Sequence, residues 1–375
     1  MAKVYFPGLN GLRFIGAFAV IICHIEFLKS LHGLPNIMNY PFYKNTSGHQ
    51  GVILFFVLSG FLITYLLLNE FSEKSTIEIG KFYMRRVLRI WPLYFIYLLI
   101  VIFLNGISNA QWPLLFVLLM IPNLRISFAG VTNVAVGSHN LTYMVGHYWS
   151  LGVEEQFYAF WPWIIKKSKS ILRFLIVIPL AYVFIKVALR LLHAPYGLIT
   201  FFNYTRFGCL TIGALGAYLY FNNSSKFNYW FTKKEIEISA WLLLLVVAFN
   251  KFHLTSIIDH EIIAVVTLII IVNQISNLKK IINLENKVFD FLGKISFGLY
   301  VYNPLVIYLM AFIINPFEIE NALFKQVLIY ITVVPVVILT AYLSYHYFEK
   351  IFLRIKYKYA IIESASSKSE FQKLA

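Results

Sequence analysis

Two residues with ionisable side chains lie eleven positions apart in the first apolar segment of the chain, Leu9 to Leu28: Arg13 and His24. Such side chains are rare inside a membrane helix unless they serve a function. At 100° per residue, eleven steps bring the two to within roughly 20° of one helix face, about 16 Å apart along the axis. The spacing predicts a guanidinium near one membrane surface and an imidazole well inside. A snorkelling arginine and a histidine that hydrogen-bonds a neighbouring helix would give the same pattern.

Two adjacent carboxyl groups, Glu154 and Glu155, lie about one and a half turns into the apolar segment that starts at Tyr148. Buried carboxylates are costly unless they are paired, protonated or exposed to a water-filled cavity. We expect Glu154 at the depth of His24, where a carboxylate would fix the tautomer of the imidazole and support it as a general base. The alternative is an ion pair that only joins two helices.

A third group is the arginine cluster Arg85, Arg86 and Arg89, which precedes an apolar segment. If this stretch is helical, the three share a face and form a fork of guanidinium groups suited to phosphate oxygens. A basic anchor at the cytoplasmic end of a membrane helix would look similar. Three arginines without a lysine favour phosphate binding.

The composition indicates what must position these residues. Of the 375 residues, 59% are hydrophobic and 13% charged, and the mean hydropathy is +0.72. Water-soluble domains carry about twice that charged fraction. We therefore expect an all-α, polytopic integral membrane protein with about ten transmembrane helices, each of ~20 residues. The expected spans are 9–28, 51–69, 91–107, 148–165, 171–190, 204–221, 235–250, 257–274, 295–314 and 327–348.

The net charge of +15 comes from basic residues in short runs between these spans. Such runs fix membrane orientation, so nucleic acid is not an expected partner and both termini are expected in the cytoplasm. We expect a transmembrane domain at 1–349 in the inner (plasma) membrane and a basic, then polar, cytoplasmic tail at 350–375. The run 112–122 is too short to span and indicates an interfacial or re-entrant segment.

Other side chains give weaker signals. Cys23 and Cys209 lie inside expected spans and predict packing, with no disulfide framework and no metal site. The remaining histidines fall in outer loops or at span ends, and none shares a face with a matched arginine. They are His32, His49, His139, His147, His193, His253, His260 and His346. His139 and His147 could contact an acceptor, but solvated loop positions are the default.

Several short motifs stand in a fixed order along the chain: Leu9 to Arg13 followed by His24, Gly51-Val52 with Phe55 to Phe61, Arg86-x-x-Arg89, Trp149-Ser150-Leu151 with Glu154 and Tyr158, Gly293 to Tyr300, and Ser344-Tyr345 with Glu349. In this combination, from Leu9 to about Glu349, the chain resembles the acyltransferase 3 family of membrane O-acyltransferases, which mostly acetylate surface polysaccharides and other exported glycans. Any one motif alone would be weak.

The resemblance implies an acyl-coenzyme A co-substrate, with acetyl-coenzyme A expected, and no permanently bound cofactor. Its phosphates would meet Arg86 and Arg89, with Arg85 beside them and Arg13 along the path of the donor. His24 would be the catalytic histidine. The acceptor would be a glycan or a lipid-linked glycan, with membrane lipid around the protein. Supporting or acceptor-side roles would fall to Ser59, Trp149, Tyr158, Arg206 and Asn303.

Two positions depart from the family pattern. Arg206 is followed by Phe207-Gly208, without the carboxylate that is often found there. Asn303 stands where many members carry a histidine. An asparagine can donate and accept hydrogen bonds but cannot take up a proton, so His24 would be the one imidazole left at the reaction depth.

We therefore expect a membrane O-acyltransferase in which His24 acts as general base on the acceptor hydroxyl and Glu154 orients it. A transient acyl-histidine is a variant of this scheme. A secondary transporter of an anionic solute is the alternative, because intramembrane Arg, His and Glu also mark transport pathways. A membrane scaffold would leave both residues without a role. Acceptor selection is expected in the outer loops, Lys29 to Gln50 and Asn123 to His147.

Overall fold

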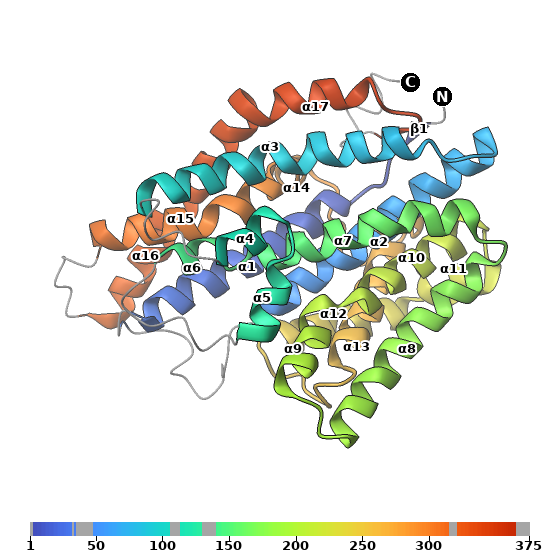
Figure 1. The fold of residues 1–375 in the computed structure, drawn as a ribbon, viewed down its shortest axis with the longest axis horizontal. Helices are drawn as coiled ribbons and strands as arrows, with labels where there is room; N and C mark the ends of the chain where they lie inside the picture. Colours follow the sequence, from blue (N-terminus) through green and yellow to red (C-terminus); the bar gives the residue numbers. More distant parts are fainter. Residues whose placement is uncertain are drawn as a thin grey trace.

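The computed structural model describes residues 3–31, 34, 48–105, 113–129, 140–314 and 321–364. Within these ranges it is a bundle of helices (Figure 1). The first and the last element are strands of two residues each. The strands β1 (Lys3–Val4) and β2 (Glu363–Ser364) pair in parallel, which places the first and last described residues at one end of the bundle. The first and last described residues therefore lie on the same side, which agrees with the expectation that both ends of the chain face one side of the membrane.

The helices follow one another along the chain as α1 (Leu9–Leu31), α2 (Gly48–Lys74), α3 (Ile79–Asn105), α4 (Pro113–Leu118), α5 (Pro122–Ala129), α6 (Asn140–Val145), α7 (Tyr148–Lys167), α8 (Ile171–Leu191), α9 (Tyr196–Thr205), α10 (Phe207–Phe221), α11 (Ser225–Phe231), α12 (Lys234–Ala248), α13 (Asp259–Ser276), α14 (Lys287–Lys294), α15 (Ser296–Ile314) and α16 (Ala322–Ser344). A π-helical turn, η4 (Tyr345–Glu349), joins α16 to α17 (Lys350–Tyr357). This confirms the expected all-α class.

Seven helices in the described part are long and apolar enough to cross a membrane. They correspond to α1, α2, α3, α8, α13, α15 and the continuous rod of α16 to α17. The three other expected spans coincide with α7, α10 and α12. α10 and α12 have 15 residues each, and α7 has 20 residues that include two glutamates. The short expected run 112–122 is divided between α4 and α5.

Helix α2 lies at the centre of the bundle, where it packs against α1, α7, α10 and α13. Its contact with α10 depends on two glycines, because a Cβ atom on Gly60 would clash with the carbonyl oxygen of Leu210 and one on Gly213 with that of Val57. Small residues at such a crossing let helix backbones approach closely. Ser59 is thereby held on a rigid, central element.

Two boundaries differ from the sequence-based expectation. α3 begins at Ile79, twelve residues before the expected span, so the arginine cluster lies within the helix, in its second and third turns. The expected tail starts as α17, which packs along α3 (Figure 1). Both differences bring basic residues to the end of the bundle where the termini lie.

Candidate active site

A cavity of about 240 Å³ lies between α1, α2, α3, α7, α15 and α17, with the end of α14 in its wall. Among the described residues that line it there is a single carboxyl group, Glu154, and there are five cationic side chains. These come from four helices and are Arg13, Arg86, Arg89, Lys294 and Lys356. We call this the cationic cavity. Such a concentration of positive charge attracts an anion, and guanidinium groups in particular bind phosphate.

Arg86 and Arg89 differ in their exposure. The Arg86 guanidinium is 5.9 Å from the ring centres of both Phe82 and Tyr158, and its Nε atom is buried without a hydrogen-bond partner. Arg89, one turn further along α3, is exposed. Buried polar atoms are normally satisfied, so a bound anion would explain the unused Nε donor. The pair offers one deep and one solvated contact to the same ligand.

Arg13 reaches the cationic cavity from α1. Its Nη1 donates to Oδ1 of Asn10 at 2.8 Å, and Nδ2 of Asn10 donates to Asp290 of α14 at 3.2 Å. The structure thus brings Arg13 together with Arg86 and Arg89, although more than seventy positions separate them in the sequence.

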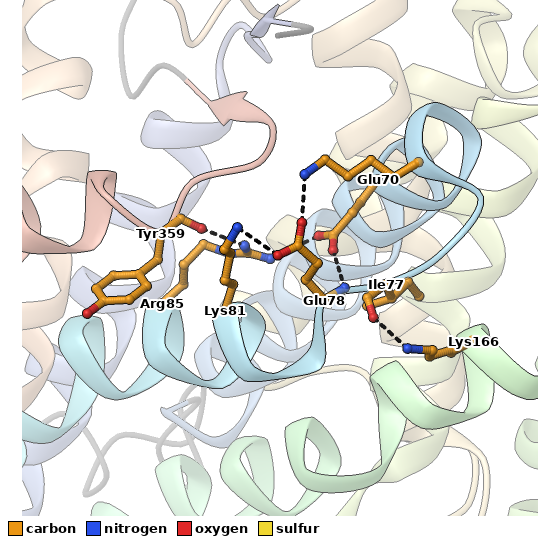
Figure 2. A network of polar contacts seen from close by, with 8 residues as sticks. Glu70, Ile77, Glu78, Lys81, Arg85, Lys166 and Tyr359 are labelled. Carbon is orange, nitrogen blue, oxygen red and sulfur yellow. Dashed lines mark hydrogen bonds and ion pairs between the residues drawn. The ribbon is translucent and has the colours of Figure 1, made fainter.

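Arg85 does not line the cavity, and its expected role as a phosphate ligand is replaced by a structural one (Figure 2). Its Nη2 donates to the buried carboxylate of Glu70 at 3.1 Å, and its Nη1 donates to the carbonyl oxygen of Tyr359 at 2.8 Å. Neighbouring helix positions point about 100° apart, so Arg85 turns away from Arg86. It fastens the segment after α17 to the end of α2.

The short connection between α2 and α3 is held by further polar contacts (Figure 2). Glu70 accepts from the backbone N–H of Glu78 at 2.7 Å, and the Glu78 carboxylate pairs with Lys74 and Lys81 at 2.6 Å each. Hydrogen bonds from Lys74 and Lys81 lower the pKa of Glu78 to about 2. This turn lies outside the spans and fixes the direction in which α3 leaves.

Glu154 binds two hydroxyl groups in the wall of the cationic cavity. It accepts from Ser59 Oγ at 3.1 Å and from the Tyr158 hydroxyl at 2.8 Å. Ser59 comes from α2, and Tyr158 lies one turn further along α7. Three residues that the sequence proposed as site residues therefore meet, but around the cavity and not around His24.

His24 is bound by Asn303 of α15, with Nδ1 of the ring 2.5 Å from Oδ1 of the amide. The amide orientation is fixed, because its Nδ2 donates to the carbonyl oxygens of Leu299 at 2.9 Å and Tyr300 at 2.7 Å. The Tyr300 carbonyl is available because Pro304, four residues later, has no N–H to offer it. Proline therefore helps to lock the asparagine in place.

This geometry fixes the tautomer of His24. Because both amide hydrogens of Asn303 go to carbonyl oxygens, Oδ1 can only accept, so Nδ1 of His24 must donate. In the neutral ring the free lone pair is then on Nε2. The arrangement leaves His24 as a base through Nε2, with its orientation set by a neutral partner.

The expected contact between Glu154 and His24 is wrong. The ring of His24 is level with the start of α7, since its centre is 6.0 Å from that of His147, the residue that precedes this helix. Glu154 lies seven residues further along α7, about 10 Å deeper towards the cationic cavity. The nearest carboxylate along α1, Glu26, is bound by Lys29 and Tyr330 at 2.7 Å each. Helix offset, which the sequence does not specify, separates the two predicted partners.

His147 is a second imidazole at the depth of His24, where the sequence analysis expected His24 alone and set His147 aside as a solvated loop residue. It is only 4% exposed, in contrast to the solvated loop position expected for it. His24, Asn303 and His147 together form what we call the imidazole cluster. The available signal was that His147 directly precedes Tyr148 and so enters the membrane at the outer depth already assigned to His24.

Ser150 and Tyr300 connect the two groups of residues. Both line the cationic cavity, and their hydroxyl oxygens are 2.5 Å apart. The Tyr300 hydroxyl donates to the carbonyl oxygen of His147 at 2.8 Å, and Asn303 binds the Tyr300 backbone. The inner end of the imidazole cluster is therefore one hydrogen-bonded layer away from the cavity.

Arg206 and Trp149 lie together behind this layer. The Arg206 guanidinium is 5.2 Å from the Trp149 ring centre, and its Nε donates to the carbonyl oxygen of Asn203 at 2.9 Å. A carboxylate does occur in this region, on α13, but Glu261 is bound by Lys186 with 2.8 Å contacts. Neither Arg206 nor Trp149 lines the cationic cavity, so their expected role is one of support.

Some expectations fall outside the described residues. These include the side chains of His32, His49 and His139 and much of both outer loops. In the part of the chain that is described, no group of three or more His, Cys, Asp or Glu side chains is arranged to hold a metal ion.

The sequence was compared with known families and proteins. The model of the acyltransferase 3 family, described as an acyltransferase domain, matches residues 6–346. The chain therefore belongs to this family and is a multi-pass membrane protein with an acyltransferase domain. No solved structure matches it.

Three relatives add detail. The peptidoglycan O-acetyltransferase OatA of Listeria monocytogenes serovar 1/2a is 29% identical over 173 residues, 43% of this chain and 24% of that protein. O-acetyltransferase OatA of Staphylococcus aureus (strain NCTC 8325 / PS 47) is 28% identical over 232 residues, 58% of this chain and 35% of that protein. SACOL0978 of Staphylococcus aureus (strain COL), named provisionally as an O-acetyltransferase, is 26% identical over 369 residues, which are 92% of this chain and 57% of that protein. The chain thus spans from about a quarter to little more than half of these relatives.

Proposed function

We propose that this protein is an O-acetyltransferase of the inner (plasma) membrane. It moves an acetyl group from acetyl-coenzyme A, supplied from the cytoplasm, to a hydroxyl group of an envelope glycan on the other side. The relatives' names support the acetyl group, and the name of the Listeria relative supports a glycan, peptidoglycan, as the acceptor. The observation that carries the proposal is the stacking of the cationic cavity directly beneath the imidazole cluster.

The donor would bind with its phosphates in the cationic cavity. Arg86, Arg89 and Arg13 supply guanidinium groups for the phosphate oxygens, and Lys294 and Lys356 add charge at the same wall. The thioester arm would extend past Ser150 and Tyr300 towards His24. This places the anionic part of the donor at the end of the bundle where the termini lie and the acyl group near the imidazole.

His24 would act as the general base. Its Nε2 accepts the proton of the acceptor hydroxyl while that oxygen attacks the thioester carbonyl carbon. The carbon–sulfur bond then breaks, and the proton passes from Nε2 to the leaving thiolate, giving the ester and free coenzyme A. Asn303 holds the Nδ1–H and so keeps Nε2 available throughout. Glu154 does not touch His24 and instead shapes the cavity wall through Ser59 and Tyr158.

The decisive experiment measures coenzyme A release from acetyl-coenzyme A by purified protein in proteoliposomes, with and without peptidoglycan fragments. We expect release that depends on the fragments, together with base-labile acetate on the recovered glycan. If acetyl-coenzyme A stays intact while an anionic solute crosses the bilayer, the result would instead indicate a transporter.

His24→Ala tests the base. We expect acetate transfer to fall to background while the protein inserts at normal levels, because an alanine side chain cannot accept the proton of the acceptor hydroxyl. The matched control is His253→Ala, which removes an exposed histidine paired with Asp259 and should leave transfer unchanged. Transfer retained by His24→Ala would refute the assignment.

A further inference from the structure

His147 is a buried imidazole without a hydrogen bond of normal geometry. The residue is 4% exposed, and in the described part of the chain Nδ1 and Nε2 have only the backbones of Val301 and Met144 near them, neither in good hydrogen-bond geometry. Most buried polar groups are satisfied, and an exception calls for a physical explanation, such as a ligand that the site is built to receive. A phenylalanine would fill the same space without the cost of two unsatisfied nitrogens.

The surroundings hold His147 in place by means other than its nitrogens. Its backbone carbonyl accepts from the Tyr300 hydroxyl at 2.8 Å and from Ser150 Oγ at 3.3 Å. Its ring packs edge-on against Tyr148, Tyr300 and Tyr97, with centres 4.8, 5.3 and 5.8 Å away. Packing and backbone contacts therefore fix the imidazole without a hydrogen bond of normal geometry to either ring nitrogen.

The distance to His24 is informative. Two imidazoles that share a direct N–H···N hydrogen bond have ring centres about 5 Å apart, given a donor–acceptor distance near 2.9 Å. The centres of His24 and His147 are 6.0 Å apart with the planes at 72°, so the rings do not bond each other. A hydroxyl oxygen that hydrogen-bonds one nitrogen of each ring would hold the ring centres further apart than a direct bond does, roughly 6 to 8 Å.

The two rings also offer complementary groups. The contact with Asn303 leaves His24 with a lone pair on Nε2, which accepts a proton. Neutral His147 carries one N–H, which donates. A hydroxyl oxygen needs both, since it donates its hydrogen and accepts through one lone pair while the other lone pair attacks the acyl carbon.

We propose that the acceptor hydroxyl binds between His24 and His147, with His147 as its hydrogen-bond donor. The proposal rests on the proposed function and names the group that positions its second substrate. His147 ends the connection that follows α6, on the side from which the sequence-predicted topology brings the acceptor. The acceptor class is an alcohol, as on a sugar ring, and His147 exchanges no proton in the reaction.

The test compares His147→Phe, which keeps the ring and its packing, with His147→Gln, which keeps a donor. Acetate transfer is measured as base-labile acetate on peptidoglycan fragments, and coenzyme A affinity is measured on the same preparations. We expect His147→Phe to lower transfer about 10- to 100-fold, from the loss of a hydrogen bond at a desolvated site. His147→Gln should retain clearly more transfer, and both should bind coenzyme A as the wild type does. His253→Phe is the matched control.

Three results would overturn the proposal: wild-type transfer by His147→Phe, transfer by His147→Gln no better than by His147→Phe, or a loss of coenzyme A affinity in parallel with transfer. The last would mean that the histidine is only structural. His24→Ala distinguishes a failure of the acceptor subsite from a failure of the proposed base. If that variant is inactive while His147→Phe is normal, only the subsite fails; if it is active, the proposed base fails.

Discussion

The cationic cavity and the imidazole cluster are adjacent but differ in charge: the cavity is strongly positive, and among the described residues the cluster has no unpaired charged side chain next to His24. The cavity gathers five cations from α1, α3, α14 and α17 around one carboxyl group. The cluster places the amide of Asn303 and the imidazole of His147 beside His24, and the nearby carboxylate Glu26 is bound by Lys29 and Tyr330. One region suits a charged ligand, and the other suits a group that must lose and regain a proton.

The difference shows what each task requires. Affinity for phosphate increases with fixed positive charge, and the arginines need no change of state. A general base must begin unprotonated, and a partner that only accepts from Nδ1 fixes the tautomer without holding the ring in its charged form as a carboxylate would. Asn303, which the sequence suggested as a loss, is in the structure the group that orients the base.

Among the substitutions that leave His24 in place, the largest effect should come from Asn303→Leu. We expect acetate transfer to fall about 100-fold, because the ring loses the partner that fixes its tautomer, while coenzyme A affinity stays unchanged. Asn303→Asp keeps an acceptor for Nδ1 and should lose less. Asn222→Leu, which removes an amide bound only to the Tyr218 carbonyl, is the control. Equal loss of donor affinity in Asn303→Leu would erase the distinction between the two regions.

The next effect concerns donor affinity. Arg86→Ala should weaken coenzyme A binding about 10-fold or more, since its buried Nε donor has no other partner. Arg89→Ala should have a smaller, salt-sensitive effect because that side chain is exposed. Lys81→Ala, on the same helix but paired with Glu78, serves as the control in calorimetric titrations. Unchanged affinity in Arg86→Ala would reduce the cluster to a topological anchor.

Glu154→Gln tests whether Glu154 belongs to the cationic cavity or to the imidazole cluster. The amide oxygen can still accept from a hydroxyl of Ser59 or Tyr158, so we expect transfer to change only a few-fold. Coenzyme A binding should be equal or tighter, because the one carboxyl group among the lining residues is removed. A steady-state assay of both substrates measures this. A loss as large as that of Asn303→Leu would return Glu154 to the role of orienting the base.

The smallest effect lies at the turn that supports the cavity. The pKa of Glu78, about 2, is below the usual value, so its ion pairs stabilise the fold above the ordinary carboxyl pKa of about 4.3. That contribution is lost as the pH falls towards 2. Since the pairs are solvated, Glu78→Gln should lower Tm only slightly at pH 6 and not at all near pH 2. A large drop in Tm at pH 6 would show that this turn limits the stability of the whole bundle.

Hydropathy located the spans, because burial of a helix in hydrocarbon depends on a local run of apolar residues. Local spacing also placed Arg86 and Arg89 on one face. Local spacing gave the wrong partner for Arg85. Arg85 lies four residues before Arg89, but this spacing does not reveal that the buried carboxylate of Glu70 and the carbonyl of Tyr359 bind the Arg85 guanidinium. Whether a residue faces a ligand or a neighbouring segment depends on what packs there.

The sequence by itself determined the helical membrane class, the family and the identity of most polar groups inside the bundle, since these follow from composition and short motifs. Only the tertiary structure decided which of them meet. The offset of α1, α7 and α15 along one another paired His24 with Asn303 and His147 and left Glu154 about two turns away. Apolar helices can slide along each other without changing their hydropathy, so side-chain packing and close glycine contacts set the register that creates the site.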